Sequence, residues 1–262
     1  MEMRMYLREW LGIDLTTLPA AAEAQDKPAS AEFYAQFYQA LASGRGKIDP
    51  QWLESKRELG EAIERFIIAP WQQQHKRSPR ILALGAGKAP VERVWHQRGH
   101  AVTFHDCQED SLAEVRRLHP QAEFLVGDIS KLAPVGRYAL VTMICVDYVL
   151  NRREFIAFLS RAVRWLEPGG QIVLFCASTL SFRQMAAEII KRSLGRYRNG
   201  RRIFWGYWRT PGEFFATARQ AGLRVARVYR AGGSGLREVA PLLRRLPPLR
   251  DNGLIMTLEL NP

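Results

Sequence analysis

The sequence predicts an α/β protein with a doubly wound, mostly parallel sheet. From residue 79 onward, short apolar runs alternate with amphipathic segments of helical period, a pattern typical of parallel strands joined by helical crossovers. A turn containing two glycines, Gly85-Ala86-Gly87, follows the first apolar run. The length of 262 residues suits one such domain with an added segment.

The first region, residues 1–78, is predicted to be a helical cap that contributes to substrate binding. In "AEFYAQFYQALAS", apolar residues recur at helical spacing with Tyr34 and Tyr38 among them. Such a stripe is usually core, but both tyrosines are also candidate substrate contacts. A second helix is expected after Asp49, an N-cap residue, with Pro50 at its first position.

The second region, residues 79–262, is predicted to carry the sheet. Its strands are expected at 80–86, 100–106, 122–129, 138–146, 169–177, 223–231 and 254–260. Helices are expected at 90–99, 110–120, 152–166 and 210–222. In such a sheet, ligands bind beyond the carboxyl ends of the strands. A basic, partly helical insertion at about residues 180–210 is interpreted as a lid.

Composition argues against several classes of protein. The three cysteines lie far apart without a C-x-x-C pair, so we expect neither a metal site nor a disulfide framework. The N-terminal "MEMRMYLREW" is charged and unlike a signal peptide. No apolar stretch approaches the ~20 residues of a membrane helix. We therefore expect a reduced, cytoplasmic protein.

The positive charge is concentrated in one part of the chain. The formal net charge is +12, and residues 183–250 hold sixteen Arg or Lys against three acids. A local basic excess attracts anions. The sequence therefore favours an anionic partner over a merely soluble surface.

The glycine turn does not suit a dinucleotide. Pro90 occupies the third glycine position of a G-x-G-x-x-G loop and has no N–H to offer a phosphate, although it suits the first turn of a helix. A nucleoside without phosphates, such as S-adenosylmethionine, meets no such objection. Asp106 ends the second strand, where an acid contacts ribose hydroxyls. Asp128 ends the third, where it is either an adenine contact or an N-cap.

The motif order resembles the class I S-adenosylmethionine-dependent methyltransferases. The motifs are "ILALGAG", "VTFHD", "FLVGDI", "ALVTMICVDYVLN" and "VRWLEPGGQIVLF". The resemblance implies a seven-stranded sheet whose last strand, 254–260, is antiparallel. It also implies S-adenosylmethionine as cofactor, with the methionyl end at Gly85, Ala86 and Gly87, the ribose at Asp106 and Cys107, the adenine at Asp128 and Ile129, and the transferred methyl beside Cys145.

Two departures from the family pattern concern the cofactor. Ala83 replaces an acid that many members carry in the first strand, and it removes one partner of the cofactor's ammonium group. Ala89 and Pro90 replace the usual glycine-containing continuation of the loop.

The catalytic candidates follow the fourth strand or lie in the insertion. All five histidines precede residue 120, which leaves Asp147, Tyr148 and Tyr207 as candidate bases. Asp147 is otherwise a helix cap, and an acceptor such as a carboxylate or phosphate oxygen needs no base.

The segment "RRIFWGYWRT" is the predicted substrate contact. Arginine binds carboxylate or phosphate, and aromatic faces stack on sugars or bases. Its candidate substrate residues are Arg201, Arg202, Trp205, Tyr207 and Arg209.

Three functions are compatible with these residues. The first is methylation, at oxygen, of an anionic small molecule or glycan, including a lipid-linked saccharide, with "PLLRRLPPLR" contacting an anionic membrane surface. The second is methylation of RNA, which lacks support from any base-methylation motif or attached RNA-binding module. The third is a non-catalytic binding protein that retains the fold.

Overall fold

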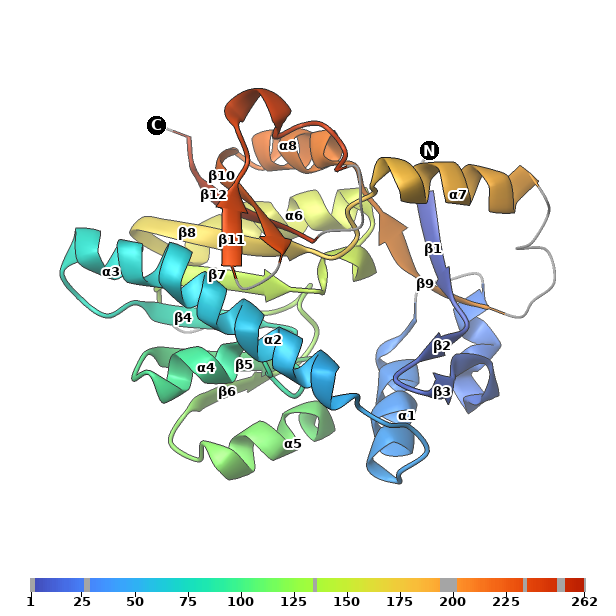
Figure 1. Cartoon of the computed structure of the whole chain (residues 1–262). Helices are drawn as coiled ribbons and strands as arrows, with labels where there is room; N and C mark the ends of the chain where they lie inside the picture. The colour runs from blue at the N-terminus through green and yellow to red at the C-terminus, as the bar shows by residue number, and fades with distance from the viewer. Residues whose placement is uncertain are drawn as a thin grey trace.

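An eight-stranded sheet forms the centre of the protein (Figure 1). The computed structural model describes residues 3–25, 29–133, 136–193, 202–232, 235–248 and 253–261. The strands of the sheet, in spatial order, are β11 (Gly235–Glu238), β10 (Leu223–Gly232), β12 (Leu254–Leu260), β8 (Leu166–Cys176), β7 (Tyr138–Ile144), β4 (Arg80–Leu84), β5 (Ala101–Asp106) and β6 (Glu123–Val126).

The strand directions confirm the predicted sheet, with one addition. Strands β4 to β8 are parallel to their neighbours within that group. Strand β12 is antiparallel to both β8 and β10, as expected for the last strand. The short edge strand β11, antiparallel to β10, was not predicted and makes the sheet eight-stranded rather than seven-stranded.

Helices cover both faces of the sheet. Because side chains alternate along a strand, Ile81 and Ala83 belong to one apolar core and Leu82 and Leu84 to the other. The first core includes residues of α2 (Pro50–Ile63), α3 (Ala69–His75), α4 (Glu92–Gln97) and α5 (Glu109–Leu118). The second includes residues of α6 (Arg152–Ala162) and α8 (Pro211–Gln220).

Side-chain caps fix where three of these helices begin. The Asp49 carboxylate accepts a hydrogen bond from the Gln51 N–H at 2.9 Å, with Pro50 at the first helical position, as predicted. Capping boxes begin the other two, from Asn151 with Glu154 and from Thr210 with Glu213. Each cap pairs backbone groups that a helix end would otherwise leave unsatisfied.

The prediction that residues 1–78 are helical is wrong for the beginning of the chain. Strand β1 (Met3–Leu7) pairs with β9 (Ile203–Trp208), and β2 (Glu9–Trp10) pairs with β3 (Ile13–Asp14). Short 3-10 turns follow: η1 (Leu15–Thr17), η2 (Pro19–Ala21) and η3 (Glu23–Gln25). Because β1 obtains its partner from a strand two hundred residues away, no local pattern reveals it.

A third apolar core holds this N-terminal segment together. Phe33 and Phe37 of α1 (Ala31–Ala42) are fully buried and pack with Ile203 and Trp205 of β9. By contrast, α2, the π-helical η4 (Glu64–Ile68) and α3 follow one another and contribute to the core of the sheet. The packing therefore separates the chain before α2 rather than at residue 78.

The remaining elements connect the sheet to its surroundings. They are η5 (Asp147–Val149), η6 (Val163–Trp165), α7 (Phe182–Ser193) and η7 (Pro241–Leu243). No helix in the described ranges has both the length and the apolarity of a membrane span.

We predict that Gly206→Ala destabilises the protein. A Cβ at Gly206 would overlap the backbone carbonyl of Tyr148 in η5, so β9 would have to move away from η5. We expect a loss of about 1–3 kcal/mol in the free energy of unfolding, measured by chemical denaturation.

Gly212→Ala is the matched control. A Cβ there, in α8, would have no atom nearer than 3.9 Å, and alanine is the better helix former. Equal stabilities for the two variants would contradict the close contact between β9 and η5.

Candidate active site

A cavity of about 780 Å³ opens where β4, β5, β6 and β7 end. Its volume is in the range of small-molecule sites. One part of its wall comes from the loops that follow these strands, and another from the N-terminal segment and β9. The cavity therefore lies between the main sheet and the N-terminal segment with β9.

The glycine loop follows β4 and lines the cavity. Gly85 and Gly87 have φ angles of +61° and +55°, in the left-handed region that glycine adopts at least cost. A Cβ on Gly85 would meet the Val146 side chain at 2.5 Å. Pro90 is also on the wall, but helix α4 begins at Glu92, two residues after the predicted start.

Asp106, at the end of β5, forms a hydrogen bond with the backbone of the glycine loop. Its Oδ2 accepts a hydrogen bond from the Gly87 N–H at 2.9 Å, and its Oδ1 accepts from the Gln108 N–H at 3.2 Å. The carboxylate is buried yet lines the cavity. Cys107 lines it too, with its Sγ 3.5 Å from Asp106 Oδ1.

His105 connects two loops through a neutral ring. Its Nδ1 lies 3.4 Å from the Gly85 N–H and its Nε2 lies 2.9 Å from the Gly127 carbonyl. Because the amide can only donate, the ring proton belongs on Nε2, where it reaches the carbonyl. Burial lowers the pKa of His105, which favours this neutral form.

The predicted adenine residues lie together after β6. Asp128 and Ile129 both line the cavity. Asp128 Oδ1 also accepts a hydrogen bond from the Ser130 N–H at 2.7 Å, so the carboxylate orders its own loop while it faces the cavity.

Sequence reasoning missed a charged pair beside the glycine loop. The Lys56 ammonium of α2 lies 3.6 Å from the Cys145 Sγ and 5.4 Å from the centre of the Trp52 ring. Glu92 lines the same cavity and is 3% exposed. Burial raises the pKa of Glu92 to about 7, and Lys56 opposes this rise. An acid in the first turn of a helix is ordinary, so no local signal distinguished Glu92.

Cys145 lies on the wall next to this pair. Its φ angle of +58° is unusual for a residue with a side chain. Burial raises the pKa of its thiol to about 11, with Lys56 acting in the opposite direction. Cys145 is therefore a neutral thiol at physiological pH.

The structure places Asp147 and Arg209 away from the cavity wall. Asp147 is fully buried, with its Oδ2 bonded to the Ser178 hydroxyl and 4.0 Å from the Arg209 guanidinium. Arg209 is 3% exposed and donates to the backbone carbonyls of Asp147 (2.7 Å) and Leu150. The predictions of a base at Asp147 and of a substrate contact at Arg209 are therefore replaced by a structural ion pair.

An aromatic wall faces the glycine loop across the cavity. It includes the predicted Tyr34, Tyr38, Tyr148 and Trp205, together with Trp10 and Trp52, which sequence reasoning missed. Trp10 packs on Trp205 with ring centres 4.9 Å apart. These residues come from five separate segments, so only the fold brings them together.

The other predicted substrate residues lie elsewhere. Arg202 and Tyr207 are not on the cavity wall, and the Tyr207 ring packs against Phe204 instead. Arg201 lies outside the described residues. Within the described ranges, no group of three or more His, Cys, Asp or Glu could hold a metal ion.

Comparisons with known proteins relate the chain to one family. Residues 81–170 match the family model of a methyltransferase domain. Curated protein sequences give no match. The fold is similar to that of the CcbJ methyltransferase from Streptomyces caelestis, with 17% identity over 79% of this chain and 90% of the other, and a TM-score of 0.53.

Two further solved structures share the fold. Magnesium protoporphyrin IX methyltransferase (ChlM) from Synechocystis PCC 6803, with bound SAH, is 14% identical over 87% of this chain and 95% of the other, with a TM-score of 0.57. The mitomycin 7-O-methyltransferase MmcR is 15% identical over 91% and 60%, with a TM-score of 0.59. The family model, the strand order and these structures agree on the fold: residues 81–170 match a methyltransferase domain, and the fold of the chain is similar to that of solved methyltransferases.

Proposed function

We propose that the protein is a methyltransferase that binds S-adenosylmethionine in the sheet half of the cavity and methylates a small, ring-containing acceptor in the aromatic half. The observation that carries the proposal is the single cavity that joins the glycine loop and Asp106 to the aromatic wall. The strand-end loops form only one side of this cavity, and the aromatic wall forms the other.

The polar groups of the sheet half suit a nucleoside. Asp106 Oδ2 accepts one hydrogen bond, from the Gly87 N–H, and retains a lone pair for a ribose hydroxyl, whereas Oδ1 accepts from both the Gln108 N–H and the Cys107 thiol. From the aromatic wall, the buried Tyr34 hydroxyl, which has no hydrogen-bond partner among the described residues, is also available to the nucleoside. A Cβ on Gly87 would lie 2.9 Å from the Tyr38 hydroxyl, so glycine keeps this part of the cavity open.

Glu92 and Lys56 suit the amino-acid end of the cofactor. Ala83 is fully buried in the core of the sheet, so an acid at that position would have no access to the cavity. Glu92 supplies a carboxylate for the ammonium group, and Lys56 supplies a cation for the carboxylate. We propose that the Glu92 carboxylate takes the place of the acid that many family members carry at the position of Ala83.

When bound, S-adenosylmethionine supplies a methyl group on a positively charged sulfur, and the chain supplies alignment. Tyr148 lines the acceptor half, and burial raises the pKa of its hydroxyl far above the usual value, so it donates a hydrogen bond rather than acting as a base. Of the other acids on the described wall, Glu92, Asp106 and Asp128 face the cofactor half, and Glu154 caps α6.

The acceptor therefore has to lose its proton without help from a base. We propose a phenolic hydroxyl or a carboxylate carried on a flat ring that stacks on the aromatic wall. This acceptor is anionic, as the sequence predicted, but the reason is different because Arg202 and Arg209 do not line the cavity. The RNA alternative lacks support for the same reason.

We predict that S-adenosylmethionine binds about fivefold more tightly at pH 8 than at pH 6. Burial raises the pKa of Glu92 to about 7, so lowering the pH protonates the carboxylate and removes the partner of the ammonium group. In Glu92→Gln, affinity at pH 8 falls by about tenfold and the pH dependence disappears. Isothermal titration calorimetry measures both.

Glu109→Gln is the control, because Glu109 forms an exposed ion pair with Arg116 away from the cavity. A Glu92→Gln variant with the wild-type pH dependence would contradict the role of Glu92. Absence of binding by the wild-type protein would contradict the proposed function itself.

We also predict that Trp52→Leu raises the KM for a phenolic acceptor by about fivefold with little change in kcat, because stacking contributes about 1 kcal/mol. Trp52→Phe retains most of the affinity. Transfer of labelled methyl to panels of phenols, aromatic carboxylates and aliphatic alcohols measures these effects. Equal transfer to aliphatic alcohols would contradict the proposed acceptor.

A further inference from the structure

Exposed apolar side chains concentrate in two short segments outside the cavity. The described residues include ten large apolar side chains that are exposed, and six of them lie in α7 and in residues 241–248. They are Phe182 (49%), Ile189 (58%), Ile190 (58%), Leu242 (93%), Leu243 (49%) and Leu246 (51%).

Helix α7 presents its apolar stripe to the solvent. Phe182, Ala186, Ile189 and Ile190 are exposed at positions i, i+4, i+7 and i+8 of one helical face. Glu188 is only 5% exposed and binds Lys191 at 2.9 Å. This orientation is the reverse of that of an ordinary surface helix, which buries its apolar face.

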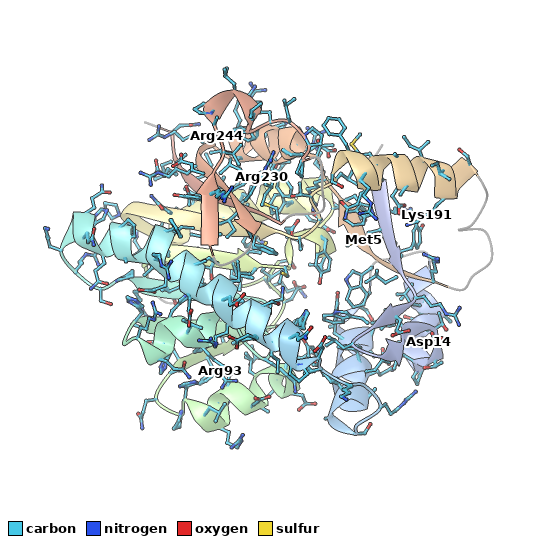
Figure 2. All side chains as sticks on the ribbon, in the orientation of Figure 1. Met5, Asp14, Arg93, Lys191, Arg230 and Arg244 are labelled. Atoms are coloured by element: carbon cyan, nitrogen blue, oxygen red, sulfur yellow. The ribbon has the colours of Figure 1, made fainter. Side chains whose placement is uncertain are left out.

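The two segments adjoin each other. The Phe182 N–H at the start of α7 donates to the Pro248 carbonyl at 2.9 Å. Figure 2 labels Lys191 on α7 and Arg244 in residues 241–248. We call these residues, 182–193 and 241–248, the exposed apolar patch.

Positive charges accompany this patch. Arg183 and Arg245 are exposed, and no carboxylate in the described part of the chain forms an ion pair with either. The nearby acids are neutralised, because Glu188 pairs with Lys191 and Glu238 pairs with Arg244 at 2.8 Å. The patch therefore combines apolar side chains with a net positive charge.

We infer that the exposed apolar patch docks the enzyme on the surface of an anionic lipid membrane. An amphipathic helix with apolar residues and flanking basic residues lies in the headgroup region, where apolar burial and attraction to anionic lipids add. A second copy would bring like charges together, and a nucleic acid would leave the leucines and isoleucines without apolar contacts. This inference does not depend on the proposed acceptor.

Co-sedimentation of the full chain with vesicles tests the docking. We expect binding to phosphatidylcholine vesicles that contain phosphatidylglycerol, and binding to phosphatidylcholine alone that is weaker by about tenfold or more. High salt weakens the first binding. No binding to the anionic vesicles would overturn the inference.

Variants locate the contact. Leu242→Glu combined with Ile190→Glu reduces anionic vesicle binding by about tenfold or more, and Arg183→Gln with Arg245→Gln reduces its salt dependence. Leu118→Glu, at an exposed leucine of α5, retains full binding. All variants are compared for thermal unfolding, and since the substituted side chains are exposed, each keeps the wild-type midpoint.

Two results would reject membrane docking at this patch. One is equal vesicle binding by the wild type and the Leu242→Glu, Ile190→Glu double variant. The other is a wild-type dimer, detected by light scattering, that this double variant converts to a monomer, because it would assign the patch to a second copy of the chain.

Discussion

The buried guanidinium of Arg209 connects the sheet to the segment that completes the cavity. It follows β9 and donates to the carbonyls of Asp147 and Leu150 in the loop after β7, with the Phe155 ring 4.8 Å away. A buried cation is tolerated only when hydrogen bonds and an opposite charge compensate its desolvation. Because Arg209 satisfies both conditions only in this position, β9 stays beside the loop, and Trp205 and Tyr148 face one cavity.

The two halves of the cavity depend on different features of the chain. The sheet half depends on backbone geometry: left-handed glycines after β4, held by Asp106, and a neutral His105 that connects two loops. The acceptor half depends on large aromatic side chains from distant segments. Lys56 and Glu92 also line the cavity, and they are the charged groups that we propose for the cofactor's amino-acid end.

The side chains of the Arg- and Trp-rich segment around β9 lie in different environments. Its Trp205 faces the cavity, whereas Arg209 is buried beneath the wall and Arg202 lies off it. The exposed arginines lie instead on several elements of the surface, including Arg183 in α7, Arg227 in β10 and Arg245 after η7. The basic excess of the sequence therefore belongs to the outer surface, and the cavity remains mainly apolar.

The sequence by itself determined the mostly parallel sheet and its antiparallel last strand, and it predicted which strand-end residues line the sheet half of the cavity. Those features depend on local periodicity and on glycines and acids at strand ends. Such signals are local in sequence, so they can be recognised without knowing the tertiary contacts. Only the tertiary structure decided that residues 3–7 pair with β9, that Asp147 and Arg209 form a buried ion pair, and that Glu92 faces the cavity in place of Ala83. These outcomes depend on contacts between residues far apart in sequence, for which neither spacing nor composition carries a signal.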